Sequence, residues 1–225
     1  MYLTDVMRAG VIAATLSLQA TMVGAALQGP AQNPQPVSLA GELLVASSSM
    51  MDPRFFRSVI LVVRHDRNGA FGIVINRPLG ERPVSDLLDA IGEKGSGVTG
   101  SVRIFAGGPV EPRAAFVVHS AEYRHAETID IDGRVAVTSS HEILHDIANG
   151  QGPKQSLIAF GYAGWRAGQL EDELRQGAWV TASQDTKLIF EEDRDKVWDN
   201  AMTRRTQDLE VVFTGSGEVC GSGRR

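Results

Sequence analysis

The chain has few of the residues that define several protein classes. Its 225 residues include one cysteine, Cys220, and aromatic residues make up only 6%. No internal disulfide can form, so a small disulfide-stapled scaffold is excluded and a reducing compartment fits. Collagen-like, mucin-like and coiled-coil compositions are also absent. The 24 Gly and 9 Pro in a 43% hydrophobic chain instead favour one turn-rich mixed α/β domain.

Basic charge is also scarce. The chain carries 22 Lys+Arg against 27 Asp+Glu, a net charge of −5. The first 40 residues are neutral overall and residues 204–225 carry +1, so the middle of the chain carries −6. A domain with this charge repels a phosphate backbone, and direct DNA binding is disfavoured.

The N-terminus is apolar without the pattern of a strong targeting segment. Residues 9–27 are apolar, and residues 28–36 are rich in Pro and Gln. Asp5 offsets Arg8, and polar residues interrupt the apolar run, which weakens both a signal peptide and stable membrane insertion. We therefore predict an extension and linker over residues 1–38 and a cytoplasmic protein, with export through the apolar segment as the alternative.

Short β-runs between turn dipeptides fill the middle of the chain. The expected strands cover residues 41–46, 58–64, 70–76, 101–105, 114–119, 129–137, 156–160, 178–182 and 187–190. Asn68-Gly69 predicts a hairpin, because both residue types tolerate positive φ, and Arg77-Pro78 is expected to end the strand that follows. Asp132-Gly133 predicts a second hairpin.

Helices are expected at four places between these strands. The first helix is expected to start near Ser85, and the other three cover about residues 141–148, 169–176 and 193–204. Ser85 is a plausible N-cap, and Ser139 with Glu142 has the spacing of a capping box. The remaining residues, 206–225, form a Gly/Ser/Arg tail that we expect to be unstructured.

Four separated motifs resemble those of the YqgE/AlgH family, in the same order and with the same spacing. They are Met51–Ile60, Gly69–Pro78, Gly107–Val110 and Gly161–Glu171. The resemblance covers residues 39–205, which we take as one domain. It implies an α/β (α+β) fold in which a bifurcated mixed β-sheet curls into a pseudo-barrel with flanking helices, in a bacterial cytosolic protein. It implies no particular reaction, although the family name carries a transcriptional-regulator label.

One local motif favours chemistry. His141-Glu142-Ile143-Leu144-His145 is an H-E-x-x-H pattern, which on a helix would aim two imidazoles at one zinc with Glu142 as the base. No histidine follows His145, so a third ligand would have to be Glu171 or Glu173. The capping role of Glu142 is the simpler interpretation, and zinc hydrolysis stays the alternative.

Polar and aromatic residues gather at the expected ends of strands, where binding residues often lie. The candidate binding surface consists of Asp52, Arg54, His65, Asn76, Arg77, Tyr162, Trp165, Gln169 and Glu171. We expect Arg77 and Trp165 to leave strands into loops at one end of the sheet, although Trp165 could instead cap the core.

The sequence thus favours a non-enzymatic regulatory or accessory protein that needs no cofactor. It would bind a protein partner or a small ligand and affect transcription indirectly. A zinc-dependent hydrolase is the second hypothesis, and a direct DNA-binding regulator is the third.

Overall fold

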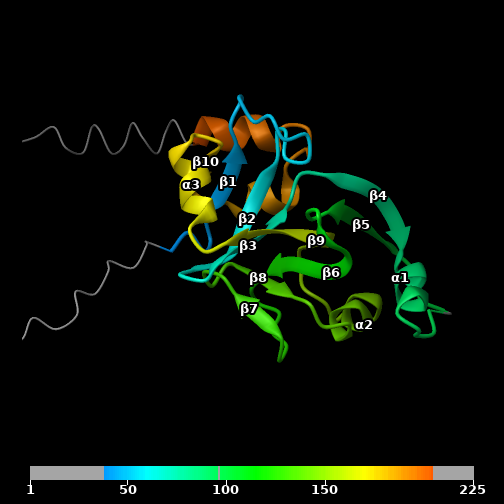
Figure 1. Ribbon diagram of the computed structural model, residues 1–225. Coiled ribbons are helices and arrows are strands. Elements are labelled where there is room, and N and C mark those ends of the chain that lie inside the picture. Colours follow the sequence, from blue (N-terminus) through cyan, green and yellow to red (C-terminus); the bar gives the residue numbers. More distant parts are fainter. Residues whose placement is uncertain (1–37, 96, 205–225) are drawn as a thin grey trace, which may run out of the picture. The chain divides into compact units, whose positions relative to one another are not determined.

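The computed structural model describes residues 38–95 and 97–204, and ten strands there form one sheet (Figure 1). The strands are β1 (Leu43–Ala46), β2 (Val59–Asp66), β3 (Gly69–Val74), β4 (Pro78–Pro83), β5 (Ser101–Ala106), β6 (Val110–Ser120), β7 (Thr128–Asp130), β8 (Val135–Thr138), β9 (Ser156–Arg166) and β10 (Trp179–Ala182). The expected tail, and all of the expected extension except residue 38, lie outside the described residues.

The helices are short. They are α1 (Val84–Ala90), α2 (Glu142–Ala148), α3 (Gln169–Arg175), the π-helix η1 (Lys187–Glu191) and a last helical stretch over residues 197–204. No helix among the described residues is long and apolar enough to cross a membrane.

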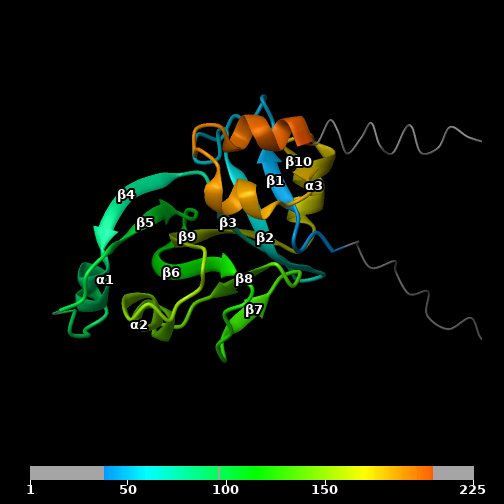
Figure 2. The same cartoon turned by 180° about the vertical axis from the view of Figure 1, so that it is seen from behind.

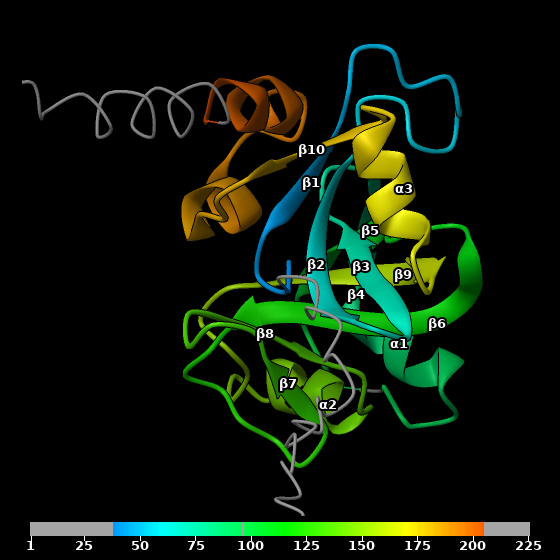
Figure 3. The same ribbon diagram turned by 60° about the vertical axis from the view of Figure 1, so that its left-hand side comes forward.

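The sheet is mixed and forks at β9. Along its main path the strand order is β10-β1-β2-β3-β9-β6-β8-β7, while β5 also pairs with β9, and β4 pairs with β5. The β5–β9 pair is parallel, and β9 runs antiparallel to both β3 and β6. Figure 3 shows the long strand β6 curving strongly beside β9. This forked, curled sheet agrees with the fold class expected from the motifs.

The fork is possible because two backbone segments approach each other closely at glycines. The N-terminal half of β9 pairs with β6 and β5, and its C-terminal half pairs with β3. At the switch, Gly161 has a φ of +74° and lies against the backbone of Gly107 and Gly108. A Cβ on Gly108 would lie 2.1 Å from the carbonyl carbon of Tyr162, so no side chain fits there.

This arrangement corrects the expected glycine loop. The sequence predicts a strand that ends at Phe160, but β9 continues to Arg166. Glycines in a strand pattern lower its apparent strand propensity, yet they also mark close backbone approach. Here the glycines allow close backbone approach within a strand, so Tyr162 and Trp165 lie on β9 and not in a loop.

The first hairpin forms, although its turn differs from the expected one. Asp66 pairs with Gly69, so Arg67 and Asn68 make the turn, and Asn68 does not have a positive φ. Gly69 has a φ of +130°, and a Cβ there would lie 2.1 Å from the carbonyl oxygen of Trp165. The glycine is therefore needed for its contact with β9 as well as for its backbone angle.

One strand was missed and two further predictions are wrong. Residues 78–83 form β4, an edge strand whose two prolines and glycine hid it, and every residue of it is exposed. Residues 187–190 lie in the π-helix η1 and not in a strand, because a short apolar run does not distinguish a strand from a buried helix. The last helical stretch begins at residue 197 and not at 193.

The predicted caps are also wrong. The helix α1 follows Pro83, and Ser85 lies inside it. In α2 the N-cap is His141, and the hydroxyl of Ser140 accepts the Glu142 N–H at 3.3 Å in place of a Ser139 capping box. A neighbouring serine thus provides a similar hydrogen bond.

The strand β1 is buried on both faces. Leu44 and Ala46 pack with Leu170 of α3 and with Trp179 of β10, on one face. Leu43 and Val45 share the other core with side chains from η1 and residues 197–204, which Figure 2 shows covering that side of β1. This alternation follows from the two-residue period of a strand.

The glycine contact at the hairpin predicts a difference between two substitutions. Gly80 has a φ of +118° but nothing within 4 Å of an added Cβ. We expect Gly80→Ala to lower the unfolding free energy by about 1 kcal/mol through backbone strain. Gly69→Ala should lower it by that amount and by about 1 to 3 kcal/mol more, because the added Cβ overpacks against Trp165. Denaturant melts of both variants measure the difference, and equal losses would contradict the assigned contact.

Candidate functional site

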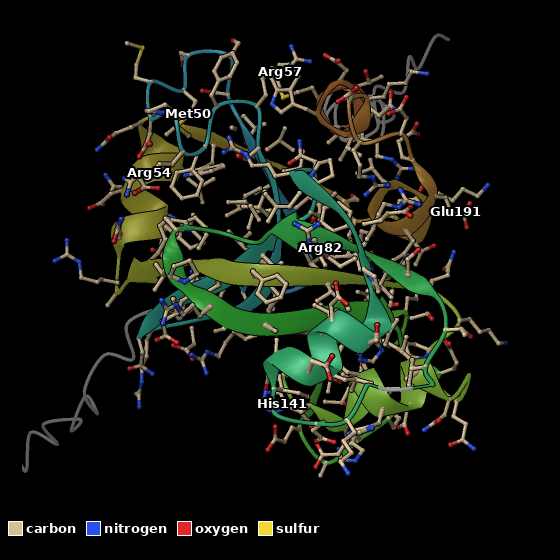
Figure 4. The ribbon with its side chains drawn as sticks, turned by 90° about the vertical axis from the view of Figure 1, so that its right-hand side faces the viewer. Met50, Arg54, Arg57, Arg82, His141 and Glu191 are labelled. Carbon is tan, nitrogen blue, oxygen red and sulfur yellow. The ribbon has the colours of Figure 1, made fainter. Side chains whose placement is uncertain are left out.

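A cleft of about 300 Å³ opens between the 47–57 loop, α3 and the ends of three strands. It brings together four of the sequence-predicted residues, Asp52, Arg54, Trp165 and Gln169. Figure 4 labels Met50 and Arg54 on the loop at its edge. The other lining residues are Met50, Phe55, Pro109, Val110, Gly164, Glu173, Ala178 and Trp179.

A single carboxylate joins the walls of this cleft. The indole N–H groups of Trp165 and Trp179 both donate to Oε2 of Glu173, each at 2.8 Å. The amide of Gln169, one helical turn earlier, donates to Oε1 at 2.9 Å. Since three neutral donors already occupy this carboxylate, Glu173 fixes β9, β10 and α3 together and is poorly placed to act as a general base.

Aromatic rings form the apolar part of the cleft. Trp165 and Trp179 meet edge to face with centroids 6.0 Å apart, and Phe55 meets Trp179 in the same way at 5.5 Å. Trp165 is only 7% exposed, and Trp179 is 2% exposed. The expectation that Trp165 leaves the sheet in a loop is therefore wrong, because its ring belongs to the core beneath α3.

The mouth of the cleft combines an ion pair with exposed apolar side chains. Arg54 and Asp52 form an ion pair on the loop, with a hydrogen bond of 2.6 Å. The side-chain hydrogen bond from Arg54 lowers the pKa of Asp52, so this carboxyl stays ionised. On the same loop Met51 is 91% exposed and Phe56 55%, and Val110, which lines the cleft, is 36% exposed.

Asn76 and Arg77 hold this loop without lining the cleft. Asn76 accepts the Val59 N–H at 2.9 Å and donates to the carbonyl of Arg57 at 2.9 Å. Arg77 donates to the carbonyl of Phe56 at 2.9 Å. Desolvation lowers the pKa of Arg77, as expected for a guanidinium that is partly covered. Both residues therefore position the segment that carries Phe55.

His65 and Glu171 form a separate pair. The Nδ1 atom of His65 accepts the Leu39 N–H at 3.1 Å, so the ring proton is on Nε2, which donates to Glu171 at 3.0 Å. The hydroxyl of Ser38 also donates to the His65 carbonyl. This neutral histidine anchors the start of the described chain beside α3.

Tyr162 lies on the other face of β9 from Trp165, because residues three apart on a strand alternate. Its ring packs against Phe71 and Phe116 at centroid distances of 4.9 and 5.9 Å. Tyr162 is thus separated from the cleft.

The H-E-x-x-H segment has a different setting from a zinc site. His141 is the N-cap residue of α2, and Nε2 of His145 pairs with the carboxylate of Glu93. Glu171 is engaged by His65 and Glu173 by the two indoles, so neither acts as a third ligand in this arrangement. Within residues 38–95 and 97–204, no group of three metal-ligating side chains is arranged to hold a metal ion.

Sequence reasoning missed the residues that complete the cleft, namely Phe55, Val110, Glu173 and Trp179. The place of Glu173 in the cleft could have been predicted, because Glu173 follows Gln169 by four residues and so shares its helix face. No sequence pattern predicts the place of Trp179, because only the pairing of β10 with β1 brings it under α3.

The burial of Trp165 predicts a stability effect. Trp165→Ala removes a core ring and an indole donor, so we expect a loss of about 3 to 5 kcal/mol of unfolding free energy. Phe56→Ala, at an exposed aromatic of the same region, should change stability by no more than about 0.5 kcal/mol. Urea titrations of the two variants give the comparison; a small loss for Trp165→Ala would contradict its place in the core.

Known proteins of similar sequence cover most of this chain. A UPF0301 protein of Jannaschia sp. is 42% identical over 183 residues, which cover 80% of this chain and 95% of the relative. A UPF0301 protein of Rhodospirillum rubrum is 38% identical over 80% of this chain and 94% of its own length.

Solved structures support the same conclusion. The solution structure of the AlgH protein from Pseudomonas aeruginosa has a TM-score of 0.67 and 32% identity, covering 85% of this chain and all of that one. Protein DIP2367 from Corynebacterium diphtheriae shares the fold at a TM-score of 0.58 and 22% identity, over 76% and 87% of the two chains. The expected α+β fold is thus confirmed. Since residues 43–210 also match the sequence pattern described as AlgH-like, the chain belongs to the AlgH-like family.

Proposed function

We propose that this protein is a non-enzymatic accessory protein that docks a protein partner at the cleft beside the 47–57 loop. The observation that carries the proposal is the contrast between the floor and the rim of this cleft. The carboxylate of the floor is already hydrogen-bonded to three donors, while Val110 and the loop beside the cleft expose large apolar side chains. Such a surface favours binding over proton transfer.

Two of the exposed apolar residues, Met51 and Phe56, belong to the same loop as the lining residues Asp52, Arg54 and Phe55. The third, Val110, lines the cleft from β6. Burying apolar surface of this kind contributes about 25 cal/mol per Å² to association before its entropic cost is subtracted. We therefore expect the partner to insert an apolar side chain between Val110 and the loop.

The Asp52–Arg54 pair gives this mouth a polar edge. Arg54 is 65% and Asp52 31% exposed at the side chain, so the pair is screened and contributes little to folding. Exposed charges at an interface act mainly on orientation and association rate. In this proposal the pair selects the partner, while the apolar rim supplies most of the affinity.

Composition bears on the compartment and on DNA contact. One cysteine favours a reducing compartment such as the cytoplasm, and a net charge of −5 disfavours direct DNA contact. A role in transcription, which the family label suggests, would then act through a partner. The partner-docking proposal does not depend on which pathway that partner serves.

Charge substitutions at the rim test the proposal. Full-length protein carrying a photo-crosslinker at Met51 should capture a partner that can then be purified. Met51→Glu and Val110→Glu should each weaken that partner about tenfold or more in a direct binding assay, equivalent to about 1.4 kcal/mol, because each places a charge in a desolvated contact.

The matched control is Leu79→Glu, since Leu79 is 58% exposed but lies on β4. This variant should bind the partner as the unmodified protein does. If no protein is captured in a way that depends on Met51 and Val110, or if Leu79→Glu weakens binding equally, the cleft is not the docking site.

A further inference from the structure

A second hollow lies apart from the cleft, between α1, α2 and the strands β6 and β9. It holds about 360 Å³. Figure 4 labels His141 at its α2 side, beside α1. Its lining residues are Leu87, Ala90, Ile91, Arg113, Ala114, Ala115, Phe116, Ser139, His141, Leu144, Ile158 and Phe160.

A smaller hollow of about 150 Å³ lies on the other face of β6 and is walled by Phe71, Phe116 and Val137. Phe116 pairs with Ala159 and Val117 pairs with Ile158, so the side chains of Phe116 and Ile158 point to opposite faces of the sheet. The larger hollow, on the Ile158 face, is therefore a separate site, and we call it the β6 groove.

The walls of the β6 groove are mostly apolar. Leu87, Leu144 and Ile158 belong to one core cluster and are 9%, 5% and 1% exposed. The ring of Phe160 is partly buried and packs against the same cluster. A groove of this volume, apolar with a few polar side chains, has the character of a small-molecule site.

Arg113 is the charged side chain in the lining of the groove. The lining also includes His141 and Ser139, and it contains no Asp or Glu. Arg113 is exposed and forms no ion pair with another described residue. A lining with an arginine and no carboxylate favours an anionic ligand.

We infer that the β6 groove binds an amphiphile with an apolar chain and an anionic head, of the class of a medium-chain fatty acid. The acyl chain lies along Phe160, Leu144 and Ile158, and the carboxylate pairs with Arg113. A guanidinium matches a carboxylate through two parallel hydrogen bonds, which favours this head group over a neutral or cationic one. This site is independent of the partner-docking cleft.

Calorimetry with three ligands of equal chain length tests the head-group preference on the full-length protein. Dodecanoate, kept below its micelle-forming concentration, should bind saturably at one per chain. Dodecanol should bind at least about tenfold more weakly, because it has no charge to pair with Arg113. Dodecylamine should not bind measurably, because its ammonium group is repelled by Arg113 and meets no carboxylate in the lining.

Two pairs of variants localise the site. Arg113→Gln should weaken dodecanoate about tenfold, whereas Arg166→Gln, at an exposed arginine ending β9, should not change it. Ala90→Phe, at an exposed position of α1 that lines the groove, should abolish binding, whereas Ala167→Phe, at an exposed turn position before α3, should not. Melting curves of all four confirm that they are folded.

Several results would overturn the inference. They are the absence of saturable dodecanoate binding, equal affinity for dodecylamine, or unchanged affinity in a folded Arg113→Gln. Binding to phosphatidylglycerol vesicles without binding to free dodecanoate would also overturn it, because that pattern indicates a membrane surface and not an enclosed acyl site.

Discussion

The crossing of two glycine backbones at β9 is the constraint on which the rest of this fold depends. Gly107 donates its N–H to the carbonyl of Phe160 at 2.7 Å and accepts the Val74 N–H at 2.8 Å, so it bridges β3 and β9. A Cβ at Gly107, Gly108 or Gly161 would lie 2.1 to 2.4 Å from backbone atoms of the opposing segment. Only glycine allows this approach, and the approach lets one strand pair with β3, β5 and β6. The most distinctive glycines of the family motifs are therefore architectural.

The same strand positions both candidate sites. The C-terminal half of β9 carries Trp165 into the floor of the partner-docking cleft, and its N-terminal half carries Ile158 and Phe160 into the β6 groove. The cleft is closed by Glu173, whose carboxylate ties β9 to α3 and β10. The groove is closed by α1 and α2, which meet on the far side of the fork. A fold built in this way separates the proposed protein-binding surface from the proposed ligand-binding one.

The sequence predicted what depends on local pattern and missed what depends on tertiary pairing. The β2–β3 hairpin, α3 and the fold class follow from turn residues, amphipathic spacing and four ordered motifs. The edge strand β4 was missed because Pro78, Gly80 and Pro83 oppose strand propensity, which pairing with β5 overrides. Of the candidate binding surface, Asp52, Arg54, Trp165 and Gln169 converge, whereas Tyr162 lies on the opposite face and His65 pairs with Glu171 elsewhere. Sequence spacing alone could not give the face of a strand whose existence the glycines concealed.

Amide hydrogen exchange at the crossing tests this account most directly. If the fork is the constraint that the fold depends on, the amides of Gly107 and Val74 open only with global unfolding. Their exchange free energies should then equal the free energy of unfolding measured by denaturant, while the exposed β4 amides exchange through much smaller openings. Exchange of Gly107 and Val74 as fast as that of β4 would contradict the account, because the crossing would then open without unfolding the sheet.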